Sequence, residues 1–194
     1  MVTGRLCSAG LIAAKIPKMT FFVAKSLLMK LTSGKVLATM LDEQRNLTRF
    51  YLSKLKGEDM YREFEVNGYT TNSPYWILAH LCWAENMLAI QCMGAKGVDI
   101  PWLNDFKIHS PKGEKPANQP SLEEVLEAFK QIHAVSLETI SSLTDKELDQ
   151  ENPLGLAFGE NKSKRFMAMH AVRHEGTHCG QLSLIARMYG KKTV

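Results

Sequence analysis

The chain has 194 residues, of which 45% are hydrophobic and 23% charged, so its composition is typical of one globular domain and excludes a disordered protein. A folded chain of this length buries about 70% of the surface that its unfolded form exposes, so folding itself requires neither disulfides nor a metal. The net charge is +4 because residues 1–41 contain six cations and no acid, whereas the chain from Asp42 onward has a net charge of −2. No basic stripe follows residue 41, which argues against a nucleic-acid partner.

We interpret residues 1–26 as an N-terminal extension to a domain at residues 27–194, with Met19 as an alternative start. The apolar stretch within residues 1–18 is short and is interrupted by Lys15, unlike the core of a signal peptide. No apolar run approaches the roughly 20 residues of a membrane span. The four cysteines form no CxxC pair, which is typical of a reduced intracellular protein. We therefore expect a cytoplasmic location and no membrane partner.

The first two predicted helices are separated by a loop. Apolar residues follow the helical period from Leu27 to Leu55, which predicts the first helix, and no strand is expected in the loop after it. Ser73 can cap the second helix, and Pro74 suits its first position. We expect this helix to end near Gly94.

A long connection, rich in proline and glycine, follows the second predicted helix. We expect Trp102 and Phe106 to anchor this connection to the rest of the fold. Ser121 and Glu124 form a capping-box pattern, which predicts that the third helix begins there and runs to about Leu143.

Thr144 and Asp145 are expected to end the third helix, and a loop then leads to the fourth. The fourth helix is predicted from about Ser163 to Tyr189, with Gly190 as its stop. Four helices without a strand predict an all-α fold. The favoured architecture is an antiparallel four-helix bundle with a long loop between its second and third helices.

Three of the six histidines lie on the fourth predicted helix, as His170, His174 and His178. Each step of four residues advances about 400° around a helix, so neighbouring members lie one turn apart on the same face. Either adjacent pair could chelate one metal ion. His80 lies on the inward stripe of the second helix and is the natural third ligand, because bundle metal sites use facing helices. Three histidines leave one coordination position open, as in catalytic sites.

Two other histidine patterns do not lead to a site. Residues 174–178 also match HExxH, the zinc-protease signature. The longer metzincin pattern fails because Gln181 and Leu184 stand where it requires glycine and histidine, and no acidic residue follows the segment to act as the third ligand of the other form. A protease is therefore not expected. His109 and His133 have no patterned partner and are interpreted as non-ligands.

Two segments, SPYWILAHLCWAE at residues 73–85 and HEGTHCGQL at residues 174–182, together resemble the DinB/YfiT-like superfamily. The resemblance covers roughly residues 27–190 in helix order and spacing. It implies a four-helix bundle in which one histidine of the second helix and two of the fourth hold a divalent metal, usually zinc or nickel. In this sequence those ligands are His80, His174 and His178.

The resemblance also implies a type of chemistry. Relatives of known activity include mycothiol-dependent maleylpyruvate isomerases and bacillithiol S-transferases, and homodimers are common among them. We therefore expect a metal-dependent enzyme that presents a metal-bound thiolate to an electrophilic small molecule, with a low-molecular-weight thiol as cofactor. Glu175 and Gln181 are expected to assist catalysis. His170 and Glu85 are expected to contact or hydrogen-bond the ligand imidazoles or a bound water without binding the metal themselves.

Two alternatives remain open at the level of sequence. One is a metal-dependent hydrolase that uses metal-bound hydroxide. The other is a non-catalytic, stress-related metal-binding bundle, which a fourth protein ligand such as His170 or Cys179 would favour because it would close the site. Cys179 lies about 100° around the helix from His178, so this closure is not expected.

Overall fold

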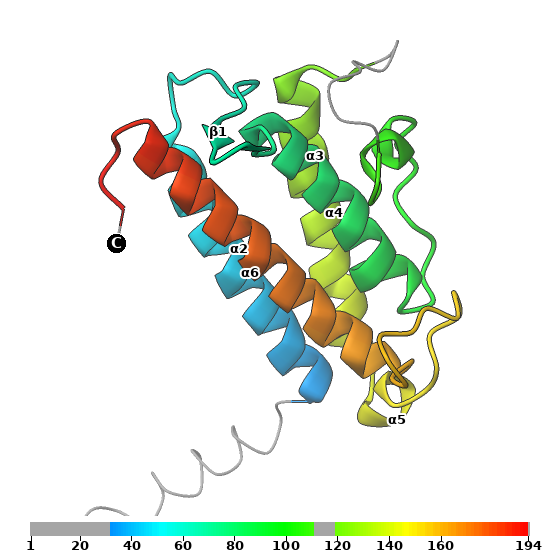
Figure 1. The fold of residues 1–194 in the computed structure, drawn as a ribbon. Helices are drawn as coiled ribbons and strands as arrows, with labels where there is room; N and C mark the ends of the chain where they lie inside the picture. The colour runs from blue at the N-terminus through cyan, green and yellow to red at the C-terminus, as the bar shows by residue number, and fades with distance from the viewer. Residues whose placement is uncertain (1–31, 111–118, 194) are drawn as a thin grey trace, which may run out of the picture. The chain divides into compact units, whose positions relative to one another are not determined.

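The computed structural model describes residues 32–110 and 119–193, and their secondary structure is mostly helical. Four long helices form a bundle, which confirms the all-α prediction (Figure 1). A π-helical turn directly continues the second of them, and a short 3-10 helix lies in the connection to the third. The bounds are α2 Ser33–Lys54, α3 Pro74–Glu85, η1 Asn86–Gln91 (a π-helix), η2 Leu103–Phe106 (a 3-10 helix), α4 Leu122–Ser142, α5 Asp145–Leu148 and α6 Lys164–Met188.

The long helices of the bundle do not simply alternate in direction. Helices α2 and α6 run one way, and α3 and α4 run the other way (Figure 1). Both α2 and α3 pack against α4 and α6. Because α3 and α4 are parallel, the chain must return along the bundle between them. This return is the reason for the long connection that the sequence predicts.

The predicted helix starts are found where the caps place them. The hydroxyl of Ser73 accepts from the backbone N–H of Trp76, and Pro74 is the first residue of α3. Ser121 and Glu124 form the expected capping box of α4. Ser163 caps α6. Short-range hydrogen bonds of this kind satisfy N–H groups that have no partner within the helix.

The first described helix also has a capping residue at its start. Helix α2 begins at Ser33, with Thr32 as its cap. The prediction that this helix starts at Leu27 falls on residues outside the described ones, as does the predicted extension at residues 1–26.

The prediction of a strand-free loop after the first helix is wrong. Residues Glu65–Val66 (β1) and Tyr69–Thr70 (β2) pair as an antiparallel hairpin. Asn67 and Gly68 connect them with φ angles of 51° and 80°. Asn-Gly is the preferred pair for a tight hairpin turn, because both residues tolerate a positive φ. The signal was therefore present in the sequence.

Thr144 does not only end the third predicted helix. Its hydroxyl accepts from the N–H of Glu147, whose carboxylate accepts from the N–H of Thr144, so a second capping box opens the short helix α5. The sequence contains this Thr-x-x-Glu pattern, but the four residues of α5 are too few to show the hydrophobic period that predicts a helix.

The connection after α3 is anchored as expected. Trp102 and Phe106 are buried, and their rings make an edge-to-face contact with centroids 5.7 Å apart. Phe106 also packs edge-to-face on Tyr75 of α3. Aromatic burial of this kind holds a loop segment in place against the bundle. Within the described residues, no helix is long and apolar enough to cross a membrane.

Gly34 allows α2 to approach the end of α4 closely. A Cβ atom at this position would lie 2.5 Å from the carbonyl oxygen of Ile140 and 2.7 Å from that of Leu143. Backbone atoms cannot rotate away as a flexible side chain can. Gly34 is therefore required by packing, although glycine weakens a helix by roughly 0.5–1 kcal/mol relative to alanine.

We predict opposite effects for two glycine-to-alanine substitutions in helices. Gly34→Ala should lower the free energy of unfolding by about 1–3 kcal/mol, because the new methyl group overpacks a backbone contact. Gly180→Ala is the matched control, because a Cβ atom there meets nothing within 4 Å. It should raise the free energy of unfolding by roughly 0.5–1 kcal/mol. Urea denaturation of both variants tests this, and equal effects would contradict it.

Candidate metal centre

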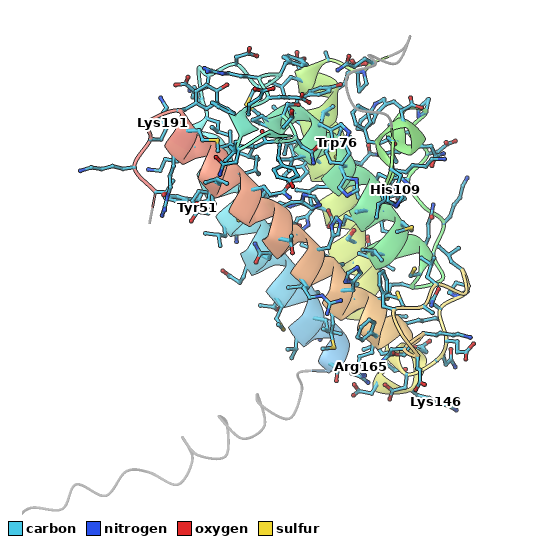
Figure 2. The ribbon with its side chains drawn as sticks, viewed as in Figure 1. Tyr51, Trp76, His109, Lys146, Arg165 and Lys191 are labelled. Atoms are coloured by element: carbon cyan, nitrogen blue, oxygen red, sulfur yellow. The ribbon has the colours of Figure 1, made fainter. Side chains whose placement is uncertain are left out.

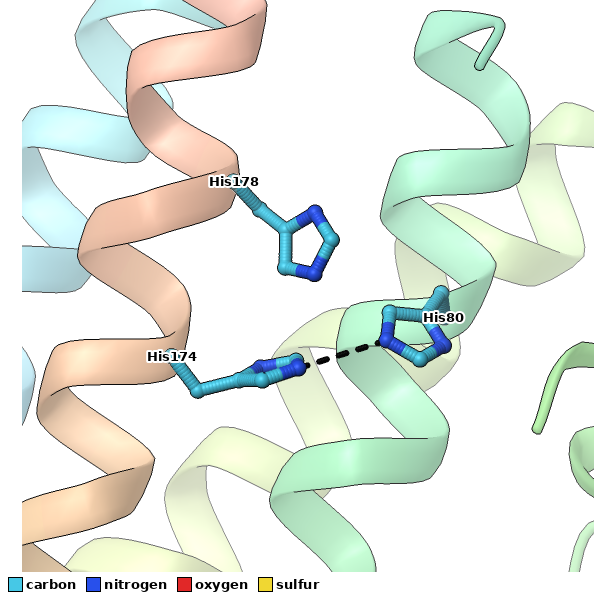
Figure 3. A group of neighbouring side chains, drawn as sticks. All are labelled: His80, His174 and His178. Carbon is cyan, nitrogen blue, oxygen red and sulfur yellow. Dashed lines mark hydrogen bonds between the residues drawn. The ribbon is translucent and has the colours of Figure 1, made fainter. Parts of the chain in front are cut away.

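Three imidazoles meet at the interface of α3 and α6. His80 comes from α3, and His174 and His178 come from successive turns of α6, so that the rings face one another across the helix pair (Figure 3). Each ring offers one nitrogen, and these three nitrogens lie within 4.8 Å of one another. The Nε2 atoms of His80 and His174 are 3.3 Å apart.

The spacing of the nitrogens suits a metal ion. Two nitrogens bound at 2.0–2.1 Å to one tetrahedral zinc are separated by about 3.3 Å, which matches the distance between the Nε2 atoms of His80 and His174. Nitrogen ligands also suit nickel, copper and iron. The residues present therefore fit a divalent transition metal.

Two of the rings are oriented by partners on their far side. Nδ1 of His80 lies 2.7 Å from the carbonyl oxygen of Phe106, to which it donates. Nδ1 of His178 lies 2.9 Å from Oε1 of Gln181, which accepts from it. In both rings the proton is thereby held on Nδ1, and the lone pair of Nε2 is directed into the site.

Burial keeps the three rings neutral near pH 7. It lowers the pKa of His80 to about 4, with a smaller contribution from His178. It lowers the pKa of His174 to about 3, and the neighbouring histidines contribute further. Burial lowers the pKa of His178 as well. Because metals bind only the neutral imidazole, these shifts leave the ligands available.

Two tryptophans enclose the ring of His80. Trp76 stacks on it with centroids 4.7 Å apart and an angle of 10° between the planes. Trp83 lies on α3 one turn beyond His80, with its centroid 5.5 Å from the same ring. Both indoles are half-buried. The site therefore has apolar aromatic walls that reduce the access of water to His80.

The other histidines lie outside the three-ring group. His170 packs against Phe158 with the ring centroids 4.0 Å apart and the planes tilted by 49°, and its Nδ1 accepts from Arg173. Its ring centroid is 6.0 Å from that of His174, so it is a neighbour of the site. His109 lies in the connection between α3 and α4 (Figure 2) and is exposed.

A buried ionic cluster lies behind the metal centre. The side chain of Arg45 on α2 is fully buried and donates to Glu85 on α3 and to both carboxylate oxygens of Glu175 on α6. It also donates to the carbonyl oxygen of Phe129 on α4 and lies over that ring. The charges of Glu85 and Glu175 outweigh the effect of burial and hold the pKa of Arg45 above its usual value.

His133 extends this cluster to the surface. Its Nδ1 lies 2.8 Å from Oε1 of Glu85, and its Nε2 lies 3.1 Å from Oδ1 of the partly exposed Asp42. Burial would raise the pKa of Glu85, but Arg45 and His133 together hold it below the usual value. His133 therefore has carboxylate partners that no sequence pattern indicated. It is not among the three grouped histidines, which agrees with its interpretation as a non-ligand.

The structure separates the roles expected for the four supporting residues. Gln181 contacts His178 directly, as an orienting residue must. The carboxylates of Glu175 and Glu85 bind Arg45, and in the described part of the chain neither accepts from a ring of the three-histidine group. His170 contacts Phe158 and Arg173.

Sequence reasoning missed Arg45, although a signal was available. The inward stripe of α2 contains Leu37, Leu41, Thr48 and Tyr51, all of which are buried. Arg45 occupies the middle of this stripe. An arginine at a core position of an amphipathic helix indicates a buried ionic partner, because an unpaired buried charge is very costly.

Comparison with known proteins agrees with the geometry. The model of one protein family, described as the DinB superfamily, matches residues 40–182, a range that includes the three grouped histidines and Arg45. None of the curated proteins compared with the chain matches it.

We predict that the metal-free protein loses stability as the pH falls from 6.5 toward 4. In this range the unfolded chain protonates His80 and His174, whose folded pKa values are about 4 and about 3, so protons favour unfolding. In a His80→Gln, His174→Gln variant the loss should be smaller by roughly 5 kcal/mol. Urea denaturation at several pH values in the presence of a chelator measures this. An identical pH dependence in both proteins would contradict it.

Proposed function

Since this chain belongs to the DinB superfamily, we propose that it is a metal-dependent enzyme that transfers a low-molecular-weight thiol to an electrophilic small molecule. His80, His174 and His178 hold a zinc or nickel ion in this proposal. The observation that carries it is the convergence of three imidazole nitrogens within 4.8 Å.

The number of ligands favours catalysis over a purely structural metal. Among the described residues, the group that includes these histidines contains no fourth histidine, cysteine or carboxylate. Cys179 is buried beside Thr48 and Gln44 on the α2 side of α6, and His170 is engaged with Phe158. Structural zinc sites are closed by four protein ligands, whereas catalytic sites keep one position for substrate or water.

A divalent ion bound by three neutral imidazoles retains its full charge and lowers the pKa of a thiol or water in its open position. The chain supports this chemistry by keeping its imidazoles neutral, because their pKa values are lowered by burial. Phe106 and Gln181 hold two of the rings in the required tautomer. Trp76 and Trp83 provide apolar walls against which the carbon skeleton of a substrate can pack.

A cytoplasmic location and a homodimeric state are part of the same proposal. The described cysteines are free and buried, as in a reducing compartment. Exposed apolar side chains on α2 support self-association. They are Val36, Met40, Leu47 and Phe50.

The first prediction of this proposal concerns metal content. Protein purified without a nickel column should contain about one equivalent of zinc or nickel by elemental mass spectrometry. A His80→Ala, His174→Ala, His178→Ala variant should contain none, because it lacks every ligand. A His170→Ala variant should retain the metal, because this ring lies outside the group. Failure of the wild-type protein to bind added zinc or nickel would overturn the proposal.

The second prediction concerns the thiol. Turnover of monochlorobimane, a fluorogenic electrophile, should require both the metal and one thiol of a panel of bacillithiol, mycothiol, glutathione and cysteine. The triple histidine variant should be reduced at least 100-fold, because its thiol is no longer activated. Metal-dependent hydrolysis of model esters with no dependence on thiol would instead favour the hydrolase alternative.

A further inference from the structure

The three histidines of the metal centre are not held in the same way. The ring of His80 is fixed by the carbonyl oxygen of Phe106, and that of His178 by the side chain of Gln181. In the described part of the chain, Nδ1 of His174 has no such partner, and its Nε2 faces His80. The position of His174 therefore depends on where α6 places its backbone.

Arg45 fixes α6 at this point. Glu175 follows His174 directly in sequence, and both of its carboxylate oxygens accept from Arg45, at 2.6 and 3.0 Å. The same guanidinium binds Glu85, which lies five residues after His80 on α3. One side chain thus joins the two helices that carry the metal ligands.

The cluster lies directly behind the site. A small cavity is lined by His174 together with Glu85 and Glu175, so the ionic cluster forms the next layer behind the unsupported ring. Arg45, Glu85 and Glu175 together carry a net charge of −1, which favours a nearby cation.

The chemistry of arginine suits this role better than that of lysine. Its planar fork offers five donors in fixed directions, so it can hold two carboxylates and a carbonyl oxygen at once. A buried ion pair of this kind seldom adds net stability, and its best-attested benefit is a unique arrangement of the surrounding elements. Here the arrangement in question is that of α3 against α6.

We propose that Arg45 is a positioning residue of the metal centre, which aligns His80 with His174 by binding Glu85 and Glu175 simultaneously. This inference rests on the proposed function, because it requires that the three histidines bind a metal.

The experiment measures zinc affinity by chelator competition, and the visible spectrum of the cobalt-substituted protein. Arg45→Met alone leaves two buried carboxylates unpaired and is expected to fold poorly. The informative variant is therefore Arg45→Met with Glu85→Gln and Glu175→Gln, in which the cluster is neutral and similar in volume. Arg45→Lys is the second variant, because it keeps the positive charge but loses the planar guanidinium that can bind both carboxylates at once.

The control is Arg165→Met. Arg165 also binds two carboxylates, those of Asp145 and Asp149, but it lies in the first turn of α6, at the end near α5 (Figure 2). The control should bind zinc as the wild type does.

The neutral triple variant should fold cooperatively, bind zinc at least 10-fold more weakly and show an altered cobalt spectrum. Arg45→Lys should also weaken binding.

Each result bears on a distinct claim. If the wild type binds neither zinc nor nickel, the proposed function fails. If the wild type binds zinc, and the folded triple variant and Arg45→Lys bind it as tightly as Arg165→Met does, only the role of Arg45 is overturned. If the triple variant does not fold, Arg45→Lys decides alone: weaker zinc binding with a preserved circular dichroism spectrum supports the role, and unchanged binding overturns it.

Discussion

The contacts of one buried guanidinium join all four long helices. Arg45 belongs to α2, Glu85 to α3, Phe129 to α4 and Glu175 to α6, and the arginine donates to each of the other three. Removing such a group from water costs several kcal/mol, so the charge is tolerated only where its hydrogen bonds are satisfied. Few relative positions of the helices meet this condition. The cluster therefore favours one arrangement of the bundle among many that would bury similar apolar area.

The metal centre depends on that arrangement and on the route of the chain. Helices α3 and α4 are parallel, so the connection between them must return along the bundle. On this return it buries Phe106 against α3 and brings its carbonyl oxygen to His80. The connection is thus both a topological requirement and part of the site. Burial by the surrounding helices and by Trp76 then keeps the imidazoles uncharged.

Much of the secondary structure could be predicted because its signals are local. A cap and its N–H partner lie three residues apart, so Ser73, Ser121 and Ser163 could be recognised as helix starts. The hairpin turn at Asn67 and Gly68 also has a local signal, because Asn-Gly is the preferred pair for such a turn. The π-helical segment Asn86–Gln91 has no comparable local signal in the sequence.

The four long helices, the class of the fold and a set of histidines with the spacing of metal ligands could be predicted from the sequence, because these follow from periodicity and from contacts a few residues apart. Helical spacing left either adjacent pair of His170, His174 and His178 open, and the family resemblance favoured the second pair. The tertiary structure places His174 and His178, but not His170, in one group with His80. It also decided that Arg45 and His133 belong to one buried cluster. Such contacts join residues about 40 to 130 positions apart. They depend on how each helix is rotated against its neighbours, which the packing of the whole bundle sets.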